Sequence, residues 1–165
     1  MRNTLKVFMT VVALLALLSP AYALSPAAVK ELDAVLSQGP ANHHFQITAN
    51  KLDKWIKAKK KDFLVVDVRK AKDYKSGHIP GAINIPYNEM LKPANLKKLP
   101  KDKILVLHCY TGQTQNLPVI ALRALGYDAR VLTFGYTSWA KGYFGGKMMK
   151  RAIGNAARKH FPIER

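Results

Sequence analysis

One stretch of this sequence, residues 104–125, restricts the fold more than any other. Ile104 to Leu107 is a short apolar run that predicts a buried strand, and Leu117 to Leu125 carries apolar residues at helical spacing. The eight residues between them, 108–115, therefore form a turn from a strand into a helix. Such turns lie at the carboxyl edge of a parallel sheet, where open α/β folds bind ligands and where a helix offers unpaired N–H groups to an anion.

Other short apolar runs alternate with helical patterns along the chain. Further strands are expected at 45–47, 63–66, 82–85 and 129–133, and further helices at 26–38, 48–59, 72–76 and 136–141, with a loose helical segment from residue 88 that Pro93 interrupts. Strands separated by helices need crossover connections, which produce a mostly parallel sheet covered on both faces. The sequence thus predicts a three-layer α/β domain.

Residues 1–23 have the pattern of a secretory signal peptide. Arg2 and Lys6 form a charged start, an apolar run covers 7–18, and Ala21-Tyr22-Ala23 is a small-x-small cleavage site. The apolar run is shorter than a comfortable membrane span. We therefore expect cleavage near Ala23 and a periplasmic or secreted mature protein.

The remaining sequence has the length of one domain with extensions. We expect an N-terminal helix and linker over 24–44, the domain over 45–142 and a basic tail over 143–165. The tail is a basic amphipathic helix that could lie on a membrane. Gly154 and several alanines weaken its apolar face, so we favour the alternative that it packs back onto the domain.

The sequence is strongly basic, and most of these charges are expected to form a solvated lysine-rich surface with no specific ligand. The 165 residues include 27 Lys and Arg against 10 Asp and Glu, a formal net charge of +17. Such a field attracts anions of any kind, from small sulfur anions to anionic lipid. Export makes nucleic acid an unsuitable partner.

Cys109 is the only cysteine, so it cannot form a disulfide within the chain. It is either buried and inert or present for its chemistry. The start of a helix favours the thiolate form, and Gly112 lets the loop curl with its N–H groups turned inward around the sulfur. We predict Cys109 as a nucleophile inside an anion-binding loop made of Tyr110, Thr111, Gly112, Gln113, Thr114 and Gln115.

Phosphoryl transfer is one chemistry that uses such a loop. His108-Cys109 matches the start of the phosphatase pattern H-C-x5-R, but Gln115 stands at the arginine position. Without the guanidinium the transferring group loses its bidentate clamp. The sequence therefore disfavours a phosphatase.

Sulfur transfer is the other, and here the sequence resembles rhodanese-like domains. The resemblance is carried, in order, by Asp67-Val68-Arg69, Tyr74, the run from Gly77 to Pro86, Cys109-x-x-Gly112, Gly126-Tyr127 and Gly135-x-x-x-Trp139-x-x-Gly142. It implies a five-stranded parallel sheet flanked by helices and a persulfide formed on Cys109. It also implies thiosulfate or a related donor, a thiol or protein acceptor, and no metal or organic cofactor.

The resemblance has one departure. Many active members carry arginine at the position of Thr114, whereas this loop has no charged residue. A second hypothesis follows, in which the chain is a non-catalytic binding or sulfur-carrier module that docks a partner.

Other polar residues have simpler explanations. Asp67 and Arg69, at the end of a buried strand, are expected to form a structural ion pair. His108 should point to the opposite side of its strand from Cys109 and not act as its base. His78 is expected to bond nearby backbone, and the adjacent His43 and His44 are too few to predict a metal site.

Overall fold

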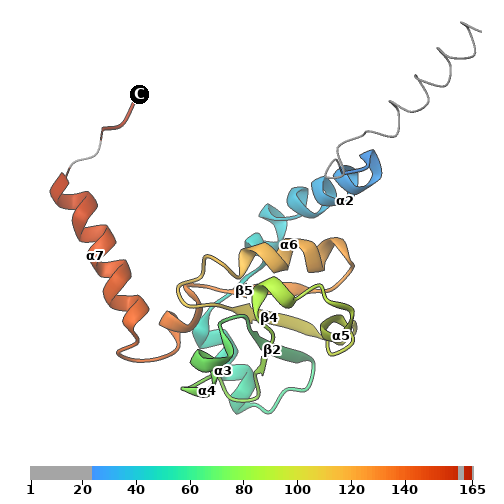
Figure 1. Cartoon of the computed structure of the whole chain (residues 1–165), viewed down its shortest axis with the longest axis horizontal. Helices are drawn as coiled ribbons and strands as arrows, with labels where there is room; N and C mark the ends of the chain where they lie inside the picture. Colours follow the sequence, from blue (N-terminus) through green and yellow to red (C-terminus); the bar gives the residue numbers. More distant parts are fainter. Residues whose placement is uncertain (1–23, 160–161, 165) are drawn as a thin grey trace, which may run out of the picture.

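The computed structural model describes residues 24–159 and 162–164, and the expected signal peptide lies outside them. Its centre is a five-stranded sheet of order β1-β5-β4-β2-β3, in which every paired strand is parallel (Figure 1). The strands are β1 (Gln46–Ile47), β2 (Phe63–Asp67), β3 (Ile83–Asn84), β4 (Ile104–His108) and β5 (Ala129–Leu132). This confirms the prediction of a five-stranded parallel sheet.

Helices connect and cover the strands. The α-helices are α2 (Pro26–Ser37), α3 (Ala49–Lys57), α4 (Ala71–Lys75), α5 (Pro93–Leu96), α6 (Asn116–Ala124) and α7 (Phe144–Lys159). Three 3₁₀ segments, η1 (Pro40–Phe45), η2 (Tyr87–Glu89) and η3 (Gly135–Ser138), complete the connections. In Figure 1, α6 lies on one side of the sheet and α3 on the other, so the domain has the expected three layers.

Each face of the sheet has its own apolar core, because neighbouring strand residues point to opposite sides. Val66, Leu105 and Leu107 pack with Leu122 of α6 on one face. The alternate positions Val65 and Val106 pack with Leu52 of α3 on the other. A strand buried on both faces reads as a continuous apolar run, which is why β2 and β4 are visible in the sequence.

Two segments differ in detail from the sequence prediction. Pro93 begins α5 and does not interrupt a helix, since proline suits the first helical position and Lys92 before it is extended. The helix expected over 136–141 is a short 3₁₀ turn, η3, that follows Phe134 in the left-handed conformation. The N-terminal helix does pack on the domain, where α2 contacts α6.

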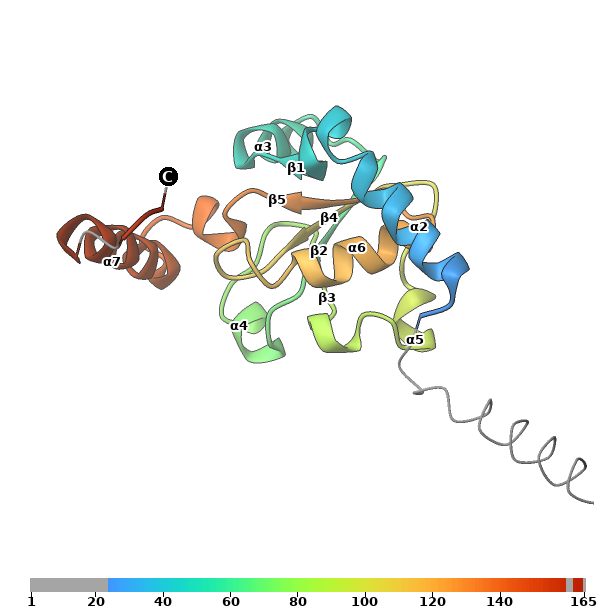
Figure 2. The same ribbon diagram turned by 90° about the horizontal axis from the view of Figure 1, so that it is seen from above.

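The tail prediction was wrong in its favoured form. The α7 helix does not fold back, and beyond its first turn it stands clear of the sheet and the covering helices (Figures 1 and 2). Gly145 is its one buried residue among those that the structure describes. None of the helices in this part of the chain is both long and apolar enough to cross a membrane.

Candidate functional site

The carboxyl ends of three neighbouring strands meet at one edge of the sheet. Asp67, the last residue of β2, lies in register with His108 of β4 and with Asn84 of β3. The chain segments that follow these strands enclose a cavity of about 220 Å³. Its lining consists of Val68, Lys70, Pro86, Tyr87, Asn88, Cys109, Tyr110 and Thr114.

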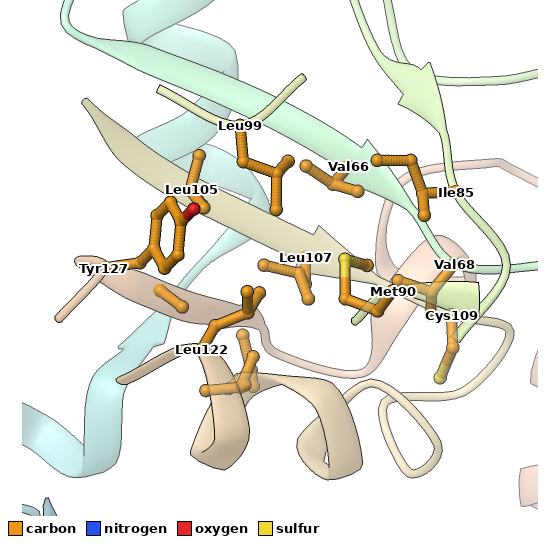
Figure 3. Packing of buried hydrophobic residues seen from close by; sticks show 13 residues of the cluster. Val66, Val68, Ile85, Met90, Leu99, Leu105, Leu107, Cys109, Leu122 and Tyr127 are labelled. Atoms are coloured by element: carbon orange, nitrogen blue, oxygen red, sulfur yellow. The ribbon is translucent and has the colours of Figure 1, made fainter. Parts of the chain in front are cut away.

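Cys109 lies at the inner end of this cavity. It is a free cysteine whose surface is 1% exposed, and it continues the apolar core row that includes Val68 and Met90 (Figure 3). The thiol is therefore shielded from bulk water but borders an open space.

The loop after Cys109 presents its N–H groups without partners. None of the N–H groups of residues 110–115 donates a hydrogen bond to any residue that the structure describes. Gly112, with φ of +92°, provides the left-handed turn that a side chain would disfavour. Six consecutive N–H groups without partners at the start of α6 are thus available as donors to an anion.

The carbonyl groups of the same loop are held from outside. Cys109 C=O accepts a hydrogen bond from the Tyr136 N–H at 2.8 Å, and Tyr110 C=O accepts from the Thr137 N–H at 3.0 Å and its hydroxyl at 2.9 Å. The η3 segment thus holds these two carbonyl groups and fixes the direction of the N–H groups in the same peptide planes, those of Tyr110 and Thr111. This preorganisation needs no charged side chain in the loop.

Gly135 allows η3 to approach the loop closely. A Cβ atom built on Gly135 would lie 2.7 Å from Cys109 O and 2.7 Å from Gly112 N. Gly135 also has φ of +56°, a conformation that few other residues adopt. Only glycine fits this contact between η3 and the loop.

The Gln115 side chain is a brace and does not face the cavity. It is fully buried, its Oε1 accepts from the Cys109 N–H at 2.8 Å, and its Nε2 donates to Leu132 C=O at 2.7 Å. The sequence had suggested this amide as a donor to a ligand. Both ends of the amide are instead used in joining β4, the loop and β5.

The other predicted loop side chains lie in different surroundings. Tyr110 and Thr114 line the cavity, whereas Gln113 is exposed. Tyr110 donates its hydroxyl to Asp73 at 2.6 Å, and burial together with this bond raises the pKa of Tyr110 to about 12. Thr111 lies beside the start of α7, within 3.0 Å of where a side chain on Gly145 would begin.

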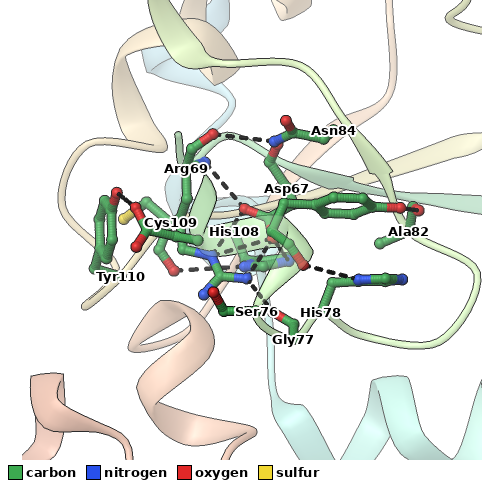
Figure 4. Close-up of polar contacts among 12 residues, drawn as sticks. Asp67, Arg69, Ser76, Gly77, His78, Ala82, Asn84, His108, Cys109 and Tyr110 are labelled. Carbon is green, nitrogen blue, oxygen red and sulfur yellow. Dashed lines mark hydrogen bonds and ion pairs between the residues drawn. The ribbon is translucent and has the colours of Figure 1, made fainter. Parts of the chain in front are cut away.

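Asp67 and Arg69 form a buried ion pair directly behind the loop (Figure 4). Arg69 Nη2 lies 2.6 Å from Asp67 Oδ2 and also donates to Gly77 C=O at 2.7 Å, while its guanidinium stacks 3.9 Å from the centre of the Tyr136 ring. The pair therefore ties the loop around Gly77 to η3. Neither side chain lines the cavity.

His108 belongs to this buried cluster and not to the thiol. Its Nε2 lies 3.6 Å from Asp67 Oδ2, and its ring stacks on Tyr136. Burial lowers the pKa of His108 to about 4, although the Asp67 carboxylate opposes the shift. The imidazole is thus neutral near pH 7.

Sequence reasoning missed Lys70, Tyr87 and Asn88 as cavity residues. Lys70 directly follows Arg69 after β2, and Tyr87 follows the end of β3. These residues could be found only from the strand order, which the sequence did not give: Lys70 follows β2, the neighbour of β4, whereas Tyr87 and Asn88 follow β3, the neighbour of β2. Lys70 is exposed and supplies a positive charge that the loop itself lacks.

The other predicted histidines, His43, His44 and His78, lie away from the cavity. His78 Nδ1 lies 3.0 Å from Tyr74 C=O, as expected, and its ring stacks on Tyr74. His43 and His44 lie in η1, and no group of three potential metal ligands occurs among the described residues.

These features define a class of protein: a parallel α/β domain that holds one cysteine in an anion-binding loop at the carboxyl edge of its sheet. The family model described as "Rhodanese-like domain" matches residues 48–142, more than half of the chain. The protein belongs to the rhodanese-like domain family.

Similar proteins carry sulfurtransferase names. The chain is 34% identical over 96 residues to the probable adenylyltransferase/sulfurtransferase MoeZ of Mycobacterium tuberculosis, which covers 58% of this chain and 24% of MoeZ. It is 33% identical over 82 residues to a sulfurtransferase of Allochromatium vinosum, with 48% of this chain and 74% of that protein covered. The chain therefore spans only about a quarter of MoeZ.

A solved structure shows the same fold. The rhodanese-like domain protein of Staphylococcus aureus superposes with a TM-score of 0.53 and 31% identity, covering 59% of this chain and 93% of that one. Family, relatives and fold together support a role in sulfur transfer.

Proposed function

We propose that this protein is an exported sulfurtransferase that carries sulfur as a persulfide on Cys109. The observation that carries the proposal is the pairing of a shielded, cavity-facing thiol with six unpartnered N–H groups in the loop that follows it. A thiolate in such a loop is stabilised, and so is a sulfur anion bonded to it.

The proposed reaction has two steps. The Cys109 thiolate attacks the outer sulfur of thiosulfate or a related sulfane donor, a new S–S bond forms, and the donor's S–S bond breaks so that sulfite leaves with the bonding electron pair. A thiophilic acceptor, such as cyanide, a small thiol or a protein thiol, then attacks the terminal sulfur and restores the Cys109 thiolate. The loop N–H groups stabilise negative charge on the terminal sulfur in both steps.

Residue roles follow from position. Cys109 is the nucleophile, the backbone of residues 110–115 and the Thr114 side chain bind the sulfur anion, and Asp67 with Arg69 supports the loop from behind. Lys70 at the cavity provides the cation that attracts an anionic donor. His108 is not a base for Cys109, because it packs among Asp67 and Tyr136.

Intact mass measurement tests the proposal. After incubation with thiosulfate and removal of excess reagent, the protein should gain one sulfur atom, and Cys109→Ser should gain none. Cyanide should remove the added sulfur as thiocyanate. No gain, or a gain that persists in Cys109→Ser, would overturn the proposal.

The alternative of a sulfur carrier or binding module rests on a specific observation. No residue from Tyr110 to Gln115 is charged, so thiosulfate meets no cation within the loop. Sulfur loading without catalytic turnover of thiosulfate and cyanide would favour a carrier that serves a dedicated partner. Repeated turnover would favour the enzyme.

Export rests on the signal-peptide pattern of residues 1–23. Fractionation of cells that produce the full chain tests it: the protein should appear outside the cytoplasm and begin near Leu24. A cytoplasmic protein that retains Met1 would contradict export but not sulfur transfer.

A further inference from the structure

The α7 helix has two chemically different sides. Its larger and smaller apolar residues share one side of the helix: Phe144, Met148, Met149, Ala152, Ile153 and Ala156. Lys147, Lys150, Arg151 and Arg158 lie on the other side, Lys159 follows at the end, and the helix contains no acidic residue. Such a helix is strongly amphipathic and strongly basic.

Only the first residue of the apolar side, Phe144, lies against the domain, with its ring 6.0 Å from that of Tyr110, and beyond it this side is largely uncovered in the described part of the chain. Met148 is 59% exposed and Ile153 is 69% exposed, and Figure 2 shows α7 apart from the sheet and its covering helices. An intramolecular role in the core is therefore excluded for this side of the helix. Exposed methionine and isoleucine on a positioned helix mark a contact surface.

The start of α7 is firmly attached to the domain. Gly145 is buried against Thr137 of η3, and the Tyr143 hydroxyl lies 3.4 Å from Arg69 Nη1. The helix thus projects from a fixed base.

Positive charge continues from α7 into a neighbouring cavity. A cavity of about 460 Å³ between η3 and the first turns of α7 is lined by Lys141, Lys147 and Lys150 together with Trp139 and Tyr143, among others. Lysines beside amphipathic aromatic rings suit the phosphate level of a lipid surface, where the ring lies at the boundary and the ammonium meets the head group.

We propose that α7 docks the protein on a bilayer that contains anionic phospholipid. The apolar side enters the acyl boundary, and the lysines and arginines bind head-group phosphates. Charge complementarity decides the partner: five cations and no acid on α7 are attracted to an anionic lipid surface, gain no such attraction from a neutral one and are repelled by a cationic one. This inference does not depend on the chemistry at Cys109.

The physical balance predicts an electrostatic mode of binding. Gly154 and three alanines limit the apolar contribution, so cations must supply much of the affinity. Each Lys or Arg near an anionic surface contributes roughly fivefold in affinity. Binding should therefore weaken steeply with salt, since the Debye length falls from about 30 Å at low ionic strength to about 8 Å at physiological ionic strength.

Vesicle cosedimentation tests the proposal with the purified full chain. Phosphatidylcholine vesicles with phosphatidylglycerol should bind it and pure phosphatidylcholine vesicles should not. Residues 1–23, which include Arg2 and Lys6, are the same in every variant, so the comparison among variants of α7 removes their contribution to binding. Equal binding to both lipids, or none to either, would overturn the proposal.

Matched variants locate the surface. Lys147→Gln with Lys150→Gln and Arg151→Gln should lower affinity by roughly 100-fold, from about fivefold per cation. The control variant Lys30→Gln with Lys54→Gln and Lys97→Gln removes the same number of exposed charges from α2, α3 and the end of α5. It should lower the affinity for anionic vesicles far less. Equal losses in both triple variants would mean that general surface charge binds the lipid, which contradicts a docking role for α7.

Two further variants separate charge from helix formation. Lys147→Arg with Lys150→Arg should keep the affinity, because glutamine, lysine and arginine have similar helix propensity and only the charge differs between the two sets. Met148→Ser with Ile153→Ser should weaken binding by about tenfold or more if these side chains enter the acyl boundary. Full binding of the serine variant would show that the apolar side does not enter the acyl boundary, and preferential binding to polyglutamate in place of vesicles would show that an acidic polypeptide is the partner; either result would overturn the proposal.

Discussion

The backbone N–H of Cys109 donates to the side-chain oxygen of Gln115 across 2.8 Å, within a loop whose other N–H groups are free. The Nε2 atom of the Gln115 side chain donates to Leu132 C=O on β5 at 2.7 Å. One buried glutamine therefore holds the backbone of the proposed nucleophile to the neighbouring strand. The residue that stands where a phosphatase has its arginine acts inside the protein and not on the ligand.

Gln115→Met should destabilise the protein, because a side chain of similar length fills the space without making either hydrogen bond. It leaves the Cys109 N–H and the Leu132 carbonyl buried without partners, at about 1–3 kcal/mol each, so the free energy of unfolding should fall by about 2–6 kcal/mol. Urea denaturation measures it. Gln113→Met is the control, since Gln113 is exposed, and should shift the value by less than about 0.5 kcal/mol. An equal fall in the free energy of unfolding in both variants would contradict a structural role for the two Gln115 hydrogen bonds.

Gly135→Ala should slow sulfur loading of Cys109 and destabilise the fold. Both Gly135 and Gly142 have positive φ, so alanine at either costs about 1–2 kcal/mol in backbone strain. Only at Gly135 does the new methyl group also meet backbone atoms, at 2.7 Å from Cys109 O, whereas nothing lies within 4 Å at Gly142. Loading rates by mass spectrometry should therefore drop at least tenfold more for Gly135→Ala than for Gly142→Ala. Similar rates would show that the contact does not shape the loop.

Lys70→Gln should weaken use of thiosulfate. A cation near the cavity attracts a divalent anion with an energy of about 1 kcal/mol in a solvated setting, so kcat/KM should fall by roughly fivefold, mainly through KM. Lys75→Gln is the control, because Lys75 is exposed at the end of α4, the helix that begins directly after Lys70, but does not line the cavity. The difference between the two variants should shrink in high salt. A fall in kcat alone would assign Lys70 another role.

His108 should make stability depend on pH. Its folded pKa of about 4 lies below its usual value of 6.5, because burial disfavours the charged ring. The unfolded chain therefore takes up this proton first as the pH falls, and the stabilisation present above pH 6.5 is lost progressively until about pH 4.

The comparison of native protein with His108→Gln isolates this contribution, since carboxylates titrate in both. The stability difference between the two should change by on the order of 3 kcal/mol from neutral pH to about pH 4. Chemical denaturation across this range measures it. Parallel curves for the two proteins would mean that His108 titrates alike in the folded and unfolded states.

The fold was predictable because the central strands are buried on both faces. The runs 63–66 and 104–107 read as continuous apolar segments; charged residues 59–62 precede the first, and Pro100 and Gly112 lie on either side of the second. Cys109 was placed correctly at the end of β4 by the same argument, since strand and helix patterns on either side leave only the loop between them.

The missed features depend on which strands are neighbours. Lys70 lines the cavity because β2 lies beside β4, and Gln115 is buried because β5 lies on the other side of β4. A linear pattern contains neither relationship. The course of α7 was missed for another reason: an amphipathic helix shows that a partner surface exists, but not whether the same chain provides it.

The order of the strands has one more consequence. Both outermost strands, β1 and β3, are two residues long, so each border of the sheet exposes very few unpaired backbone groups. A second chain would find almost no template on which to add a strand, and runaway edge-to-edge aggregation is suppressed by geometry. The longer strands, with their strongly apolar sequences, are confined to the middle of the sheet, where both sides are already occupied.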